Sequence, residues 1–148
     1  MWYITYNTTL SLHEMAVPFE PTPEELEQFF GFVYVIVELD TGKQYLGKKL
    51  LWNSKILPIT KTRKRRKKTL VESDWKEYYG SSNDVKSLVE SKGKDNFKRV
   101  ILRLCKSKGE CSYYEAKYQF DNDVLLRGDF YNEFIGCRIH SKHLKDMK

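Results

Sequence analysis

Two β-rich runs, residues 32–39 and 44–49, constrain the fold of this chain more than any other feature of its sequence. Their residues alternate along the chain, and they flank the turn sequence Asp-Thr-Gly-Lys. This pattern is typical of an antiparallel β-hairpin. We therefore expect a fold built around a sheet whose first two strands are consecutive in sequence.

The register of this hairpin decides which side chains share a face. A two-residue loop at Thr41 and Gly42 would place Tyr34 opposite Lys49. One face would then turn its apolar side chains to the core: Val33, Val35, Val37, Leu39 and Leu46. The other face would gather polar-tipped side chains around the flat spot at Gly47: Tyr34, Glu38, Tyr45 and Lys49. In this register Lys48 points to the face opposite Tyr34.

The rest of the chain predicts one more strand and two helices. Residues 50–74 read as a long irregular connection, and residues 83–93 as a short amphipathic helix that ends at Gly93. Residues 97–105 alternate like a third strand, and residues 111–120 follow as a helix. The order of strand, strand, helix, strand and helix predicts an α/β fold, with a small three-stranded antiparallel sheet flanked by helices.

The same reading divides the 148 residues into three parts. Residues 1–30 form a lead-in that contains a short helix, with Thr22 as its N-cap and Glu25 as the capping-box partner. Residues 31–135 form the main domain, with a basic insertion at about 52–74. Residues 136–148 form a basic tail.

The positive charge of the chain is concentrated in the insertion. Residues 61–68 hold seven of the 26 Lys and Arg, whereas the whole chain has 20 Asp and Glu and a net charge of +6. Such a patch can bind several phosphates of DNA. The alternatives are a solvated, partly disordered loop and a basic run of the kind found in localisation signals. The candidate DNA-binding cations are Arg63, Lys64, Arg65, Arg66, Lys67 and Lys68.

Composition argues against several other classes of protein. With 41% hydrophobic and 31% charged residues, the chain is neither disordered nor fibrous. It has no apolar run long enough to span a membrane and no leader-like N-terminus, so we expect a cytoplasmic protein without membrane partners. The three cysteines cannot all pair, and their spacing is unlike that of common zinc sites.

The start of the predicted helix 83–93 is a second candidate anion site. Ser81 and Ser82 follow Gly80, and exposed amides at a helix N-terminus can hold a phosphate. Serines at this position also cap helices without any ligand. The sequence is compatible with both phosphate binding and helix capping at these serines.

Four short motifs in order resemble the GIY-YIG nuclease family, of the free-standing homing or phage type. Phe-Val-Tyr, ending at Tyr34, and Tyr-Leu-Gly, starting at Tyr45, are relaxed forms of the two tripeptides that name the family, at the family's spacing. Glu115 on a later helix and Asn132 near the end of the domain stand where the family has a Glu and an Asn. The resemblance covers residues 31–135.

This resemblance implies metal-assisted hydrolysis of a DNA phosphodiester bond. Tyr34 and Tyr45 would lie on the active face, one of them activating or positioning the attacking water. Glu115 would hold a single divalent cation, Mg²⁺ or another such as Mn²⁺. Asn132 would support the site. Because one domain carries one such site, a homodimer on DNA is one route to double-strand cleavage.

The sequence also lacks the family's helical Arg at its usual place. The family's helical Arg would fall at Lys55, inside the irregular stretch. The hairpin register nominates Lys49 as the cation beside Tyr34, with Arg63 as the alternative. The departure also leaves open a DNA-binding module on the same fold that has lost catalysis.

Each site residue also has an interpretation without function. The two tyrosines can form an ordinary cross-strand aromatic arrangement. Glu115 can close a capping box with Ser112, and Asn132 can serve as a turn residue.

Overall fold

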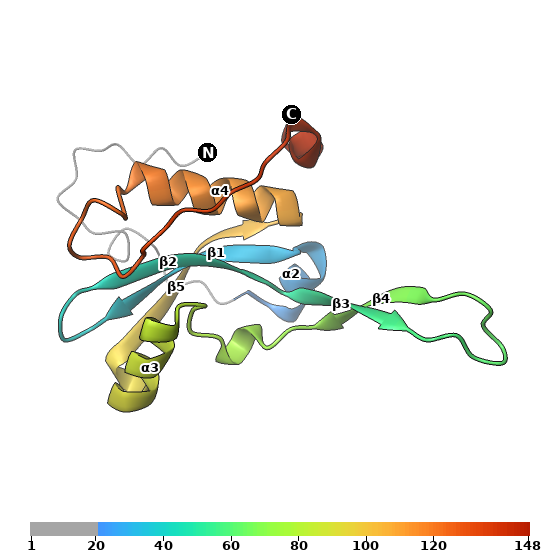
Figure 1. The fold of residues 1–148 in the computed structure, drawn as a ribbon, viewed down its shortest axis with the longest axis horizontal. Coiled ribbons are helices and arrows are strands. Elements are labelled where there is room, and N and C mark those ends of the chain that lie inside the picture. The colour runs from blue at the N-terminus through green and yellow to red at the C-terminus, as the bar shows by residue number, and fades with distance from the viewer. Residues whose placement is uncertain (1–20) are drawn as a thin grey trace.

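The computed structural model describes residues 21–148, so most of the predicted lead-in lies outside the described residues. Its main sheet has the order β2-β1-β5 and is antiparallel throughout. β1 (Gly31–Glu38) runs down the centre, between β2 (Gln44–Leu50) and β5 (Phe97–Cys105). The predicted α/β fold with a three-stranded antiparallel sheet is confirmed (Figure 1).

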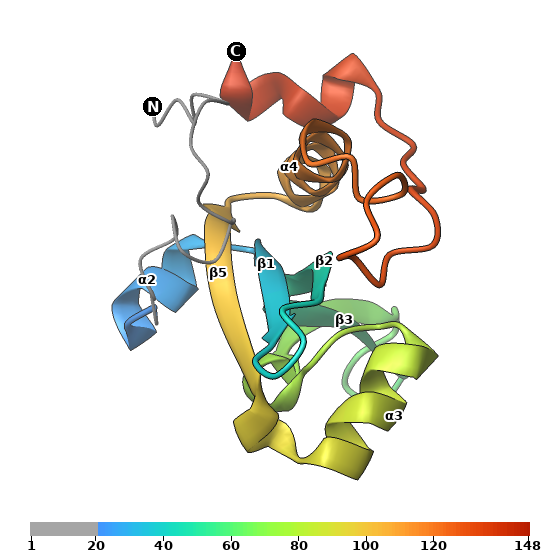
Figure 2. The same ribbon diagram turned by 90° about the vertical axis from the view of Figure 1, so that its left-hand side faces the viewer.

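One helix covers each face of this sheet (Figure 2). α4 (Lys108–Asp121) packs on the face that carries Val33 and Leu46, and α3 (Asn83–Lys92) packs on the face that carries Ile36. Every residue of β1 is consequently buried. The expectation of a single core face was therefore too narrow, because the second helix buries the other face as well.

The hairpin is shifted by two residues from the predicted register. Tyr34 pairs with Gly47, and Lys49 pairs with Phe32 instead of Tyr34. The shift keeps the predicted faces, because it is even, but it moves every cross-strand partner. The cause is a longer turn, in which the Glu38 amide donates to the Lys43 carbonyl. Leu39 lies in this turn and is 57% exposed, so its predicted place in the core was wrong.

The basic insertion is a second hairpin and not an irregular connection. β3 (Trp52–Leu57) pairs antiparallel with β4 (Lys67–Glu72), and the two strands extend away from the main sheet (Figure 1). The sequence pattern did not predict these strands, because their side chains are mostly exposed. An exposed ribbon lacks the alternation of apolar and polar residues that identifies a half-buried strand.

The shorter helices follow their capping signals. α2 (Pro23–Gln28) begins at Thr22, whose side chain forms the predicted capping box with Glu25. α3 ends at Gly93, which has a positive φ of 88°. Three 3₁₀ turns complete the described chain: η1 (Trp75–Glu77), η2 (Lys94–Asn96) and η3 (Ser141–Met147). No helix in residues 21–148 combines the length and apolar character needed to span a membrane.

A buried carboxylate ties β1 to α3 and to the C-terminal segment. Glu38 is 1% exposed and accepts hydrogen bonds from the Lys92 ammonium and the Tyr131 hydroxyl. Burial raises the pKa of this carboxyl, but the bonds from Lys92 and Tyr131 outweigh burial and lower the pKa to about 2. Lys92 also pairs with Asp40 at 3.1 Å.

The lowered pKa of Glu38 predicts a pH-dependent contribution to stability. Glu38→Gln should reduce the free energy of unfolding at pH 7 by roughly 1–3 kcal/mol, since it removes charge-assisted hydrogen bonds. The native pKa lies below the unfolded value of about 4.5, so this stabilisation is present above pH 4.5 and is lost as the pH falls towards 2. Urea unfolding of wild type and variant at pH 7 and pH 3 measures it, with exposed Glu24→Gln as control. An equal difference at both pH values would contradict the prediction.

Candidate active site

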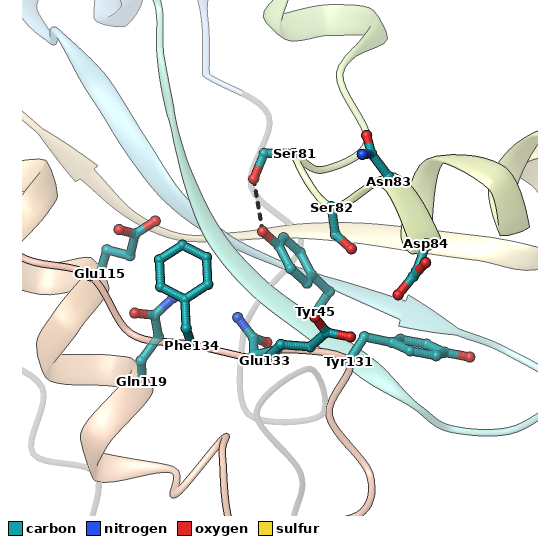
Figure 3. Close-up of a pocket in the computed structure, with 12 residues that line it drawn as sticks. Tyr45, Ser81, Ser82, Asn83, Asp84, Glu115, Gln119, Tyr131, Glu133 and Phe134 are labelled. Carbon is teal, nitrogen blue, oxygen red and sulfur yellow. Dashed lines mark hydrogen bonds between the residues drawn. The ribbon is translucent and has the colours of Figure 1, made fainter.

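A cavity of about 450 Å³ opens beside the edge of β2. Side chains from β2, the start of α3, α4 and the segment after Phe130 converge on it (Figure 3). Its lining includes predicted site residues from each of these parts: Tyr45, Ser81, Ser82, Glu115 and Asn132. The fold thus brings together five residues that are widely separated in the sequence.

Tyr45 presents its phenol to this cavity from β2. Its hydroxyl forms a 2.8 Å hydrogen bond with Ser81 Oγ (Figure 3). Burial raises the pKa of Tyr45 above its usual value, although the bond with Ser81 acts in the opposite direction. Tyr45 therefore enters this pocket as a neutral phenol that can donate or accept a hydrogen bond.

Gly80 gives the chain before α3 a backbone conformation that other residues rarely adopt. Its φ is +92°, and an added Cβ would lie 3.5 Å from the Tyr45 ring. The two serines after it reach the cavity, and Ser82 occupies the N-cap position of α3 without making a side-chain capping bond. The predicted role of Ser82 as a capping side chain is therefore not realised, which leaves its hydroxyl available within the cavity.

Tyr34 lies behind Tyr45 and is fully buried. The two ring centroids are 6.5 Å apart, and Tyr78 stacks edge-on to Tyr34 at 6.0 Å. The Tyr34 hydroxyl has no hydrogen-bond partner among the described residues. Burial, then the neighbouring phenols of Tyr78 and Tyr45, raise the pKa of Tyr34 well above its usual value. This phenol is neutral at physiological pH.

Gly47 makes room for the Tyr34 hydroxyl. An added Cβ at Gly47 would lie 2.7 Å from Tyr34 Oη, closer than real Cβ contacts. The predicted flat spot at Gly47 therefore holds the phenol of the residue directly across the strand pair. Any larger residue at position 47 would displace the ring.

Asn132 replaces a missing strand partner along the free edge of β2. Its side chain accepts from the Leu46 amide at 3.0 Å and donates to the Leu46 carbonyl at 2.8 Å. The amide of Gln119 on α4 donates to the same carbonyl at 3.1 Å. These bonds hold the backbone between Tyr45 and Gly47, so Asn132 is more than a turn residue.

Glu115 reaches the cavity from α4. The pKa of its carboxyl is raised above the usual value, because burial outweighs the opposing effect of the charge and hydrogen bonds of Lys48. Lys48 Nζ lies 3.8 Å from Glu115 Oε1 and donates to Ser112 Oγ at 2.7 Å. Ser112 lies inside α4, whose N-cap is Ser107, so the alternative of a capping box between Ser112 and Glu115 is wrong.

Lys49, the cation expected beside Tyr34, does not pair with that residue in the sheet. Its ammonium donates to Asp74 at 2.6 Å and lies 3.9 Å from the centre of the Tyr78 ring. The predicted pairing with Tyr34 was wrong because of the two-residue shift in register. Lys48, which points to the opposite face as expected, is the cation beside Glu115.

The remaining predicted cations lie on the second hairpin. Lys55 is part of β3, and Arg63 sits in the loop between β3 and β4, where its guanidinium donates to the Pro58 carbonyl at 2.7 Å. Neither residue lines the cavity. Residues 64–68 share this hairpin.

Several cavity residues were not predicted from the sequence. Gln119 lies one helical turn after Glu115, a spacing that places both on one face of α4. Glu133 and Phe134 directly follow Asn132, and Phe134 is 78% exposed (Figure 3). Lys48 was assigned to the correct face, but only the packing of α4 shows that Glu115 lies there.

The donor atoms of this cavity suit one kind of metal better than others. Within residues 21–148, no group of three or more His, Cys, Asp and Glu is arranged to hold an ion. Cys105 and Cys111 are buried, and Cys137 is exposed. A single, partly exposed carboxylate at Glu115 fits a hard cation such as Mg²⁺, which completes its shell with waters and phosphate oxygens.

A family model described as "Putative endonuclease segE, GIY-YIG domain" matches residues 16–135. No curated protein and no solved structure matches. The family match spans most of the chain, and it includes strands β1 to β5, helices α2 to α4 and, apart from Gly136, the residues that line the cavity. The chain therefore belongs to the GIY-YIG endonuclease family.

Proposed function

We propose that this protein is a DNA endonuclease that hydrolyses phosphodiester bonds in the cavity beside β2. One observation carries the proposal: Tyr34, Tyr45, Glu115 and Asn132 come from separate parts of the chain and gather around one stretch of β2. The family resemblance rests on the same four residues. Titratable groups whose pKa values are shifted by burial, here the Tyr45 phenol and the Glu115 carboxyl, tend to cluster at functional sites.

In this proposal Tyr45 positions the attacking water. Its hydroxyl reaches the cavity and is oriented by Ser81. A neutral phenol can accept a proton-donating bond from water while it donates to a phosphate oxygen. Tyr34 acts through Tyr45, because its own hydroxyl is buried behind that ring.

Glu115 would hold the divalent cation that the family resemblance implies. The cation, when bound, supplies positive charge that stabilises the scissile phosphate and the leaving oxygen. Lys48 is a positioning residue for this carboxylate, since its ammonium lies 3.8 Å from Glu115 and is also bonded to Ser112. Its charge favours the ionised form of Glu115, which is the form that binds a metal.

Substrate phosphates would be held on both sides of the cavity. Ser81 and Ser82 lie at the N-terminus of α3, where backbone amides and the helix dipole favour an anion. The cations of residues 61–68 would contact phosphates further along the duplex. Asn132 keeps the intervening backbone of β2 in place through its two bonds to Leu46.

Cleavage of supercoiled plasmid DNA tests this function. The protein should nick or linearise the plasmid with Mg²⁺ or Mn²⁺ and should be inactive in EDTA. Binding of the same plasmid is measured in parallel by gel shift. Binding without cleavage under any divalent cation, on several DNA substrates, would favour a DNA-binding module that has lost catalysis.

The two tyrosines should differ in this assay. Tyr45→Phe removes the hydroxyl that faces the cavity, so the cleavage rate should fall by at least about 100-fold. Tyr34→Phe removes a buried hydroxyl without a partner among the described residues, so the rate should fall less and the stability should be retained or improved. Single-turnover kinetics and urea unfolding measure both effects.

A tyrosine outside the cavity provides the matched control. Tyr113 lies on α4 and does not line the cavity, so Tyr113→Phe should cleave like wild type. A larger loss of activity from Tyr34→Phe than from Tyr45→Phe would reverse the proposed roles of the two phenols.

A further inference from the structure

The hairpin formed by β3 and β4 stands apart from the cavity and carries its own chemistry. It extends away from the main sheet as a two-stranded ribbon (Figure 1). Three of its large apolar side chains are at least 40% exposed: Ile56, Leu70 and Val71. The ribbon contacts the body of the protein only near its base, so its outer part is poorly stabilised by itself, which suggests a surface that a partner covers.

The two faces of this ribbon are different. On the first face, Trp52 donates from its indole nitrogen to the Phe29 carbonyl, and Trp52 and Leu70 line a hollow beside that residue. This face is attached to the body of the protein at its base. Ser54 and Ile56 continue this face towards the tip, where they pair with Leu70 and Lys68.

The second face carries two lysines, two uncharged polar side chains and two apolar ones, and we call it the reading face. It follows from the pairs Asn53 with Val71, Lys55 with Thr69, and Leu57 with Lys67, because residues paired across two strands share a face. Asn53, Lys55 and Lys67 are exposed. These side chains are of the types that contact base edges in DNA: Asn pairs with adenine, Lys with guanine, and Thr with either.

We propose that the reading face of this hairpin enters the major groove of duplex DNA and reads base sequence there. The major groove, about 12 Å wide, admits a two-stranded β-ribbon. Exposed Val71 on the same face provides an apolar contact of the kind that recognises a thymine methyl group. The partner is DNA because the charge of the ribbon is positive along its whole outer half.

The tip of the hairpin supports this docking. Residues 61–68 carry seven cations at the end of the ribbon, where they would clamp the phosphates that flank the groove. The loop is shaped by local bonds: the Thr60 and Arg63 backbones bond to each other, and the Arg63 guanidinium donates to the Pro58 carbonyl. A shaped tip places its charges reproducibly, which supports a fixed orientation on DNA.

This inference rests on the proposed function for its partner, but it assigns a separate task. Residues of the cavity would cut DNA, whereas the reading face would choose where the protein binds. Phosphate contacts alone give no sequence preference. The reading face therefore predicts a preference that survives when catalysis is removed.

Selection of binding sites from a random duplex library tests the inference. Wild-type protein in EDTA should enrich a sequence motif. Asn53→Ala and Lys55→Ala should each relax the preference at one or two positions, lowering discrimination about 5- to 150-fold there, with nearly unchanged binding to non-specific DNA. Ser54→Ala, on the first face of the same strand, is the matched control and should keep the motif. Circular dichroism of each variant checks that the sheet is intact.

Modified DNA identifies the groove. Methylation of guanine N7 in the selected motif should weaken wild-type binding at least about 10-fold, because N7 lies in the major groove. The same modification should affect Lys55→Ala less. Netropsin, which occupies the minor groove, should compete poorly.

The outcomes separate this inference from the proposed function. A retained motif in Asn53→Ala and Lys55→Ala, or the absence of any motif in wild type, overturns the reading face even if the protein cleaves DNA. Insensitivity to guanine methylation with strong competition by netropsin overturns the major-groove placement. If the sequence motif is lost in Asn53→Ala and Lys55→Ala, the role of the reading face is supported. If the wild-type protein also never cleaves DNA, the proposed endonuclease activity is contradicted while the reading face still stands.

Discussion

Replacing Glu115 by alanine is expected to reduce DNA cleavage at least about 100-fold while DNA binding stays within about 2-fold of wild type. The variant lacks the carboxylate that reaches the cavity from α4, and with it the proposed ligand of the divalent cation. It keeps every cation that would bind phosphate. Single-turnover cleavage of plasmid DNA at saturating protein, with gel shifts in EDTA, separates the two effects.

Glu133→Gln is the matched control for this variant. Glu133 lines the same cavity but lies on the segment after Asn132 rather than on α4. It should retain at least about one third of the wild-type cleavage rate. Cleavage preserved in Glu115→Ala, or lost equally in both variants, would place the metal ligand elsewhere in the cavity.

Replacing all seven Lys and Arg of residues 61–68 by Gln is expected to flatten the salt dependence of DNA binding. The negative slope of log affinity against log salt concentration should become shallower by up to about 6, at roughly 0.9 for each phosphate that is no longer neutralised. Between 50 and 200 mM salt, the affinity of the wild type should therefore fall by up to about 4 × 10³-fold more than that of the variant. Fluorescence anisotropy with a labelled duplex across this range provides the measurement.

Cations of the C-terminal tail supply the control. Lys142, Lys145 and Lys148 are far from the hairpin in sequence, and they carry a similar kind of surface charge. Their replacement by Gln should change the slope by less than about 1. An unchanged slope after substitution of the seven hairpin cations would show that they do not bind DNA.

Local sequence signals determined the elements of the main sheet and their caps. The strand predicted at residues 97–105 has these bounds in β5, and Thr22 and Glu25 form the predicted capping box. Period-two alternation and capping depend on neighbours within a few residues, so they can be read without the fold. Two tyrosines at the family's spacing likewise identified the strand pair at the centre of the site.

The tertiary structure decided the register of the strands and the side-chain contacts between different elements. The turn after Glu38 is longer than two residues, so Lys49 pairs with Phe32 and contacts Tyr78 instead of Tyr34. The packing of α4 on the opposite face brings Lys48 to Glu115. No local pattern contains this information, because it depends on which helix covers which face.

The sequence by itself determined the family, the order of the elements and the concentration of charge in residues 61–68. The tertiary structure decided that this charge lies on a ribbon with two unlike faces, and that only Tyr45 of the two tyrosines opens to the cavity. The physical reason is that composition and periodicity report which residues are near in the chain. Burial, pairing and access to a cavity depend on residues that are distant in the chain and meet only in the folded protein.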